Sequence, residues 1–230
     1  MKNKIAAIIL ARSGSTGLKN KNILNLNGLP LIAHTIKILK NVKKINKIYV
    51  STDSIRIAKI SKKFGAEVPF LRPKSLAKNM TTSEDALCYT LKKLKKEKIY
   101  NPDFIVYTQV TEPFKTSKII TKAIEILEKK KLDSVFTAKP YKKNIWYKIS
   151  KNKYRRLNNF EKYGLPRQKK VKLYREDTGV VCVSQAKVIL AKKRIGDKIE
   201  ILPYENPFDY IDIHSKEDLK VANLIMKNFF

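Results

Sequence analysis

The sequence predicts an α/β fold, a mostly parallel sheet with helices on both faces, and two observations lead to this prediction. First, residues 5–10 form a continuous apolar run, as expected of a strand buried on both faces of a parallel sheet. Second, segments of strand character alternate with segments of helical periodicity along most of the chain, which is typical of parallel strands joined by crossover helices. The 230 residues are enough for one such domain with a sizeable core.

Turn and capping signals divide the first half of the chain. Asn27-Gly28 turns a short extended segment, and Pro30 then opens a helix whose apolar residues recur at helical spacing. Ser54 caps the next helix, and an acidic first turn after Thr81 and Thr82 starts a third. The predicted strands of this half are 5–10, 47–53, 65–70 and 103–109, and the later predicted helices are 55–64 and 81–97.

The second half continues the alternation after an interruption. A helix is predicted at 117–130 and a strand at 134–138, and the pattern resumes at residue 179. The remaining predicted elements are strands 179–183, 199–202 and 210–213 and helices 185–193 and 217–229.

The interruption itself, residues 140–172, carries many basic residues and an unusual number of aromatic ones. The aromatic residues are Trp146, Tyr147, Tyr154, Phe160 and Tyr163. Linkers rarely carry so many aromatic side chains. We therefore expect a single domain, 1–230, with an inserted sub-domain at 140–172 that binds a partner.

Composition limits the class of protein. The net charge is +30, from 50 Lys and Arg against 20 Asp and Glu, but the lysines are spread over nearly every predicted helix. This favours general attraction of a polyanionic substrate over a nucleic-acid-binding patch, although a nucleic-acid-binding protein stays open as the distant alternative. Two cysteines are too few for a disulfide framework or a four-ligand zinc site. No membrane-length apolar run or signal peptide is expected, so the expected location is the cytoplasm.

The loop after the first strand is the strongest functional signal. Residues 11–17 contain two glycines, two serines and a threonine, and Arg12, Lys19 and Lys21 add positive charge. Such a loop can turn its N–H groups toward a phosphate at the carboxyl end of a buried strand. It matches neither the P-loop nor the dinucleotide glycine pattern. A turn that uses glycine for geometry alone remains the alternative.

Further candidates follow other predicted strands, whose carboxyl ends meet at one edge of a parallel sheet. They are Asp53, Arg72, Gln109 with Thr111, and Asp212 with His214. Cations, a Gly/Ser loop and a carboxylate suit a nucleoside triphosphate with Mg²⁺, because the loop and cations hold the phosphates and a carboxylate holds the metal.

The stretch from Leu10 to Ile23 resembles the signature of the acylneuraminate cytidylyltransferases, approximately (P/L)-A-R-x-x-S-K-G-(L/I)-x-x-K-N. The matching residues are Arg12, Ser15, Gly17, Lys21 and Asn22. Further stretches resemble family motifs in the family's order: 50–53, 71–77, 108–113, 165–168, 174–179 and 211–219. The resemblance thus extends over nearly the whole chain.

The resemblance implies a Rossmann-like nucleotidyltransferase fold that dimerises through the inserted sub-domain 140–172. It also implies transfer of CMP from CTP to the anomeric hydroxyl of a nine-carbon acidic keto sugar of the sialic, legionaminic or pseudaminic acid type, with release of pyrophosphate. The implied catalytic residues are Arg12, Lys21 and Asp212, with Asp212 and His214 as the Mg²⁺ site. The implied nucleotide-binding residues are Leu10, Ala11, Arg12, Ser13, Gly14, Ser15, Gly17, Lys21, Asn22, Arg72, Ser83 and Gln109. The implied sugar-binding residues are Gln109, Thr111, Arg167 and Arg175.

Three positions depart from the family pattern. Thr16 stands where the family has a lysine, His214 replaces the second aspartate of the metal site, and Cys182 stands where a sugar-contacting tyrosine is common. These departures leave a different acceptor, such as a deoxy-octulosonate, as the nearer alternative. No spacing in the chain encodes the identity of the sugar.

Overall fold

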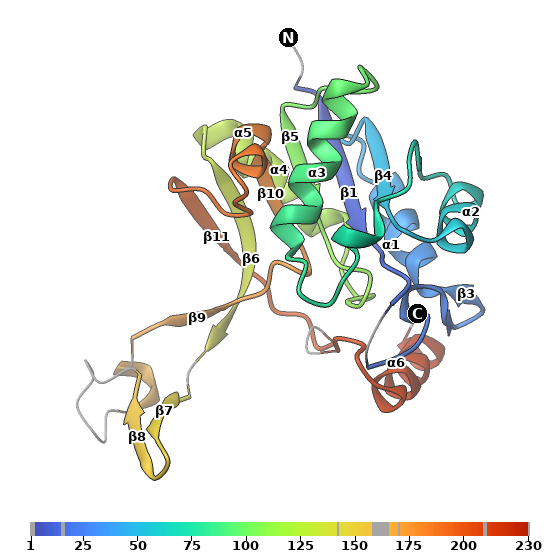
Figure 1. Cartoon of the computed structure of the whole chain (residues 1–230). Coiled ribbons are helices and arrows are strands. Elements are labelled where there is room, and N and C mark those ends of the chain that lie inside the picture. Colours follow the sequence, from blue (N-terminus) through green and yellow to red (C-terminus); the bar gives the residue numbers. More distant parts are fainter. Residues whose placement is uncertain are drawn as a thin grey trace.

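The computed structural model of the chain (Figure 1) describes residues 3–14, 17–141, 143–157, 166–169, 171–208 and 211–229. The predicted residues Ser15, Thr16, Phe160 and Tyr163, and the side chain of Arg167, lie outside these.

The strands are β1 (Ile5–Leu10), β2 (Asn25–Leu26), β3 (Leu29–Pro30), β4 (Lys47–Ser51), β5 (Phe104–Tyr107), β6 (Ser134–Tyr141), β7 (Trp146–Ser150), β8 (Lys153–Arg156), β9 (Leu173–Glu176), β10 (Cys182–Gln185) and β11 (Ile199–Pro203). The α-helices are α1 (Leu31–Lys40), α2 (Ile55–Lys63), α3 (Ser83–Lys96), α4 (Ser117–Lys130), α5 (Ala186–Leu190) and α6 (Lys216–Phe229).

The central sheet has the strand order β11-β6-β10-β5-β1-β4, with β9 paired to β6. β1 is parallel to both β4 and β5, and β11 is parallel to β6. β10 lies antiparallel between β5 and β6, so β4, β1, β5, β6 and β11 all run in one direction. The predicted class, a mostly parallel sheet, is confirmed, with β10 and β9 as the strands of opposite direction.

Helices cover both faces of this sheet, which explains the unbroken apolar run of β1. Ile5, Ala7 and Ile9 pack into a core shared with α1, α2, α4 and α6. Ala6 and Ile8 point to the other face and pack into a core shared with α3 and α5. Because successive strand residues face opposite sides, a strand covered on both sides must be apolar at every position.

The predicted helix starts are confirmed by their hydrogen bonds. The Ser54 side chain accepts from the Ile57 N–H, and the Thr82 side chain accepts from the Asp85 N–H. Pro30 precedes α1 directly, and the turn at Asn27 and Gly28 has positive φ angles of 47° and 81°. Asn and Gly tolerate this left-handed backbone better than other residues.

Two predicted strands are wrong. In residues 65–70 only Glu67 forms an isolated bridge, to Tyr49, since Gly65 has a φ of 95° and Pro69 offers no N–H to a ladder. Of the predicted strand 210–213, residue 210 lies outside the described residues and residues 211–213 are not in a strand. The Ile213 N–H instead donates to the Thr111 carbonyl at 2.9 Å, which ties this segment to the loop after β5.

An arm extends from the sheet where residues 140–172 are predicted to be inserted (Figure 1). β6 and β9 form its stalk, and β7 and β8 pair as an antiparallel hairpin beyond it. All five residues of β7 are exposed, including Trp146 at 52%, while Tyr154 on β8 is 59% exposed. In the part of the chain that the structure describes, no helix is long and apolar enough to cross a membrane.

Candidate active site

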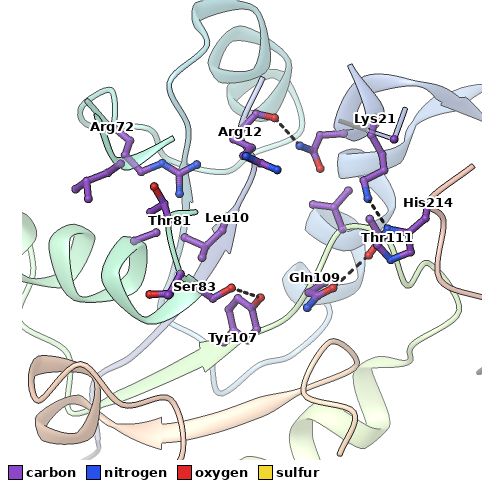
Figure 2. Close-up of a pocket in the computed structure, with 16 residues that line it drawn as sticks. Leu10, Arg12, Lys21, Arg72, Thr81, Ser83, Tyr107, Gln109, Thr111 and His214 are labelled. Atoms are coloured by element: carbon purple, nitrogen blue, oxygen red, sulfur yellow. Dashed lines mark hydrogen bonds between the residues drawn. The ribbon is translucent and has the colours of Figure 1, made fainter. Parts of the chain in front are cut away.

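A cleft of about 500 Å³ opens beside the carboxyl ends of β1 and β5 (Figure 2). It is the edge at which the sequence places its candidates, because the loops after parallel strands meet there. The residues that line it are Leu10, Arg12, Gly17, Lys21, Asn22, Arg72, Leu76, Thr81, Thr82, Ser83, Ala86, Tyr107, Gln109, Val110, Thr111 and His214.

Side chains from the loop after β4 and from the turn at Lys21–Ile23 fix the loop after β1 by hydrogen bonds. The Ser13 N–H and Oγ donate to the two carboxylate oxygens of Asp53 at 2.8 and 2.6 Å. Burial opposes the charge of Asp53, but these hydrogen bonds outweigh it and hold the pKa of Asp53 below its ordinary value. The Asn22 side chain donates to the Arg12 carbonyl at 2.9 Å. Asp53 thus supports the loop and is absent from the residues that line the cleft.

Gly17 is needed for a close approach between two segments. A Cβ at this position would lie 3.0 Å from the His214 carbonyl oxygen. A larger residue here would push the loop away from the segment that carries Asp212 and His214.

Three cationic side chains converge on the cleft from different elements (Figure 2). Arg12 donates to the Asn79 side chain at 2.7 Å, and Arg72 is only 5% exposed. Burial is the main cause that lowers the pKa of both Arg72 and Lys21, and the charge of Arg12 lowers both further. The Arg72 Nε is buried and has no hydrogen-bond partner among the described residues. Cations held this close together favour an anion between them.

Lys21, His214 and Asp212 form a chain of contacts at one side of the cleft. Lys21 Nζ lies 3.3 Å from His214 Nδ1, and His214 Nε2 lies 2.8 Å from Asp212 Oδ2. Because an ammonium group only donates, Nδ1 accepts from Lys21 and Nε2–H donates to Asp212. Asp218 fixes this segment by accepting from the N–H groups of His214 and Ser215.

Asp212 and His214 are the residues expected to hold Mg²⁺. Among the described residues, no group of three or more His, Cys, Asp or Glu side chains forms a metal site. Asp212 Oδ1 nevertheless has no hydrogen-bond partner among these residues. This oxygen is buried, and Asp212 does not itself line the cleft but contacts the lining residue His214. Mg²⁺ prefers oxygen ligands and needs only one or two carboxylates beside substrate phosphates and water. Asp212 therefore fits this metal, whereas both ring nitrogens of His214 already have protein partners.

The side of the cleft next to β5 and α3 carries hydroxyl and amide groups. Ser83 Oγ lies 3.3 Å from the Tyr107 hydroxyl, and Thr111 Oγ1 donates to Gln109 Oε1 at 3.3 Å. The ring of Tyr107 is buried, and the Arg194 guanidinium lies 5.4 Å from its centre. The Gln109 N–H donates to the Gly179 carbonyl at 2.8 Å. Tyr107 and Gln109 are two residues apart, so an extended backbone turns both side chains to the same side.

The structure brings most of the predicted site residues together. Those that line the cleft are Leu10, Arg12, Gly17, Lys21, Asn22, Arg72, Ser83, Gln109, Thr111 and His214. Ala11 is buried behind the loop, and Ser13 bonds to Asp53 instead of lining the cleft. Gly14 and Asp212 are also absent from the residues that line the cleft. Arg175 is exposed on β9 and is absent from the cleft lining of the described residues, so its role toward a sugar stays a prediction.

Three functional candidates were missed. Tyr107 lines the cleft, and its position two residues before Gln109 on the same strand face is a signal that could have found it. Glu112 and Lys115 are buried directly behind the cleft, 7% and 4% exposed. Charged residues in a loop normally indicate exposure, so the sequence offers no local signal for them.

Comparison with known proteins is consistent with the site. A cytidylyltransferase family model matches residues 6–212. The chain is 35% identical over 149 residues to post-translational flagellin modification protein B of Campylobacter coli, covering 64% of this chain and 63% of that protein. It is 36% identical over 129 residues to the N-acylneuraminate cytidylyltransferase of Escherichia coli, covering 56% of this chain and 29% of that protein.

A third relative aligns over nearly the whole chain. This is a Helicobacter pylori protein named pseudaminic acid cytidylyltransferase and UDP-2,4-diacetamido-2,4,6-trideoxy-beta-L-altropyranose hydrolase, 27% identical over 229 residues, with 97% of this chain and 43% of that protein covered. The chain therefore spans less than two thirds of the length of these three relatives.

Solved structures match the fold. CMP:2-keto-3-deoxy-manno-octonic acid synthetase in complex with CTP superposes with a TM-score of 0.74 at 13% identity, covering 99% of this chain and 100% of that one. The 4-diphosphocytidyl-2C-methyl-D-erythritol synthase of Anaerococcus prevotii gives a TM-score of 0.70 at 18% identity, with the same coverage. The predicted Rossmann-like nucleotidyltransferase fold is thus confirmed. Since the family model matches most of the chain, the predicted resemblance is also confirmed, and the chain belongs to the cytidylyltransferase family.

Proposed function

We propose that this protein transfers CMP from CTP to the anomeric hydroxyl of a nine-carbon acidic keto sugar and releases pyrophosphate. The observation that carries the proposal is the convergence of Arg12, Lys21 and Arg72 on one cleft. Asp212 lies behind the lining residue His214, and its Oδ1 has no partner among the described residues. The names of curated relatives, which include N-acylneuraminate, pseudaminic acid and legionaminic acid enzymes, support this class of acceptor.

The cationic side of the cleft is suited to the triphosphate. In the proposed reaction the sugar oxygen attacks the α-phosphorus in line, a new O–P bond forms, and the bond to the pyrophosphate oxygen breaks. The hydroxyl proton is released, and negative charge develops on the departing pyrophosphate. Arg12 and Lys21 hold the phosphates and stabilise this charge, which is the main demand of phosphoryl-type transfer.

Asp212 would hold Mg²⁺ through its unpartnered oxygen Oδ1. When bound, the metal supplies further positive charge to the phosphates. His214 donates to the other oxygen of Asp212 and so orients the carboxylate. We therefore place His214 beside the metal rather than among its ligands.

The acceptor sugar would bind beside β5. Gln109 and Thr111 offer amide and hydroxyl groups to the sugar hydroxyls. Arg167 and Arg175 would pair with the sugar carboxylate, since a planar guanidinium matches a carboxylate with two parallel hydrogen bonds.

We also propose that the arm forms a homodimer. The β7–β8 hairpin exposes apolar side chains, among them Trp146, Ile149 and Tyr154, of the kind that proteins bury against a partner.

Pyrophosphate release tests the proposal. The purified chain is incubated with Mg²⁺, each of CTP, ATP, GTP and UTP, and a panel of acids: sialic, legionaminic and pseudaminic acids and a deoxy-octulosonate. Release with CTP and one nine-carbon acid supports the function and names the acceptor. Release only with the deoxy-octulosonate would correct the acceptor class. No release with any acid would contradict the activity.

A further inference from the structure

Two buried charged side chains lie directly behind the cleft, on the loop after β5. Glu112 is 7% exposed and Lys115 is 4% exposed. Charged side chains are almost never this buried unless neighbouring groups compensate for the lost water. The contacts of Lys115 and Glu112 indicate what these two side chains do in the loop.

Lys115 ties the end of β5 to helix α1. Its Nζ donates to the Gln109 carbonyl at 2.5 Å and to Thr35 Oγ1 at 3.4 Å. The Gln109 N–H donates in turn to the Gly179 carbonyl at 2.8 Å. Both backbone groups of Gln109 are therefore held, the carbonyl by a side-chain cation and the N–H by the turn before β10.

Glu112 fills the space beside Gly179. A Cβ on Gly179 would lie 1.8 Å from Glu112 Oε1 and 3.2 Å from Gln109 Cδ. The carboxylate thus packs into a gap that exists only because residue 179 is glycine. Glu112 therefore packs against Gly179, whose carbonyl accepts from the N–H of Gln109, the residue that Lys115 holds.

The charges of this cluster depend on one another. Burial and the neighbouring carboxylate of Asp177 are the main causes that raise the pKa of Glu112 to about 8, and Asp212 adds to them. Burial lowers the pKa of Lys115 to about 8, while Glu112, Asp212 and Asp177 favour its charge. Lys139 pairs with Asp177 at 2.8 Å. Lys115 therefore balances carboxylates that include the proposed metal ligand.

The same loop is also joined to the Asp212 segment. The Ile213 N–H donates to the Thr111 carbonyl at 2.9 Å. The loop from Gln109 to Lys115 thus connects the proposed acceptor contacts, Gln109 and Thr111, to the proposed metal carboxylate. Any displacement of this loop changes the distance between the acceptor and the phosphates.

We propose that Glu112 and Lys115 form a buried positioning pair that holds Gln109 and Thr111 at a fixed distance from Asp212. The pair touches neither substrate and acts through the backbone of the loop. Its kinetic consequence rests on the proposed function, whereas its effect on the loop does not.

Kinetics of three variants test the pair. Lys115→Met removes the ammonium that donates to the Gln109 carbonyl and to Thr35 Oγ1, so the loop should shift. We expect the KM for the acceptor to rise about ten-fold or more, while the KM for CTP changes less than about three-fold. Glu112→Gln removes the carboxyl group that favours the charged form of Lys115. Because both changes act through the same ammonium group, the double variant Glu112→Gln/Lys115→Met should have an acceptor KM no higher than that of Lys115→Met alone.

Lys118→Met is the matched control, because Lys118 is exposed on the first turn of α4, and its kinetic constants should equal those of the wild type. Two results would overturn the pair. One is an equal rise in the KM for the acceptor and the KM for CTP in Lys115→Met. The other is a double variant whose rise in acceptor KM equals the effects of the two single changes combined.

Hydrogen exchange of the unliganded protein separates this proposal from the proposed function. In Lys115→Met the amides of Gln109 and Ile213 should exchange faster, while amides of β1, such as Ala7, keep their rates. Equal acceleration in β1 would mean that Lys115 only stabilises the whole fold, which would refute positioning. A wild type without any pyrophosphate release would end the proposed function, yet the exchange result would still decide the pair.

Discussion

Ser13 and Asp53 are joined by two hydrogen bonds, from the backbone N–H at 2.8 Å and from the hydroxyl at 2.6 Å. They link the loop after β1 to the loop after β4, its parallel neighbour. The loop is thereby held before any ligand binds, which reduces the ordering entropy that ligand binding would otherwise cost.

Asp53→Ala removes both acceptors and should lower the free energy of unfolding by about 1–3 kcal/mol. It should also weaken CTP binding, since the free loop must then be ordered by the ligand. Calorimetry with CTP measures this binding. Ser54→Ala is the control, because it removes only the cap of α2, at a cost of about 1 kcal/mol, and should leave CTP binding unchanged.

The same carboxylate predicts a pH dependence. The pKa of Asp53 is lower in the folded state than in the unfolded chain, so its stabilisation is complete above about pH 4 and is lost as the pH falls further. The difference in stability between the wild type and Asp53→Ala should therefore shrink in denaturant titrations below about pH 4. A constant difference across that range would exclude ionised Asp53 as the source.

Lys21→Met should lower kcat by about 100-fold or more, because it removes a cation from the proposed phosphate site. The fold should persist, since no described element depends on the Lys21 side chain for a cap or a core contact. Steady-state kinetics and a thermal melt check both parts. The exposed Lys43→Met variant carries the same change of charge and should keep wild-type kinetics.

Asp212→Asn should raise the Mg²⁺ concentration at half-maximal activity by about ten-fold or more, because an amide oxygen replaces the charged ligand. His214→Asp adds a second carboxylate and should lower that concentration. A metal titration of both variants, with the exposed Asp197→Asn as control, measures the shift. Identical titrations for Asp212→Asn and the wild type would remove Asp212 from the metal site.

Tyr107→Phe removes the hydroxyl next to Ser83 while it keeps the buried ring and its contact with Arg194. We expect the thermal stability to change little and the KM for the acceptor to rise by about two- to ten-fold, the cost of one hydrogen bond. Tyr100→Phe, on the loop before β5, is the matched control. A change confined to the KM for CTP would instead place Tyr107 at the nucleotide.

Local signals in the sequence explain which features could be predicted. The apolar run of β1 and the caps at Ser54 and Thr82 depend on residues close together in the chain, and these predictions are confirmed. Residues 65–70 have the composition of a strand but pair only at Glu67. Whether a short apolar segment finds a partner strand is decided by tertiary structure, which local composition does not encode.

The residues of the site also divide into those that local sequence predicts and those that only tertiary structure brings together. Arg12, Lys21 and Gln109 could be assigned from the family signature, and the structure places them on one cleft. The burial of Lys115 could not be foreseen. Its ammonium group is compensated by hydrogen bonds to Gln109 and Thr35 and by the charge of Glu112, and only the fold brings these residues together. These contacts depend on the tertiary structure and leave no signal in any short segment of the sequence.

The arm offers a prediction that does not depend on catalysis. Trp146→Ala and Tyr154→Ala remove exposed aromatic side chains from the β7–β8 hairpin, and large buried aromatics carry much of the energy of protein interfaces. If the arm forms the dimer, each change should shift sedimentation velocity profiles toward the monomer at a given concentration. Leu224→Ala removes an equally exposed apolar side chain from α6, where Leu224 is 62% exposed, and should leave the profile unchanged. A wild type that sediments as a monomer, or variants that remain dimeric, would show that the aromatic surface of the hairpin does not form the dimer.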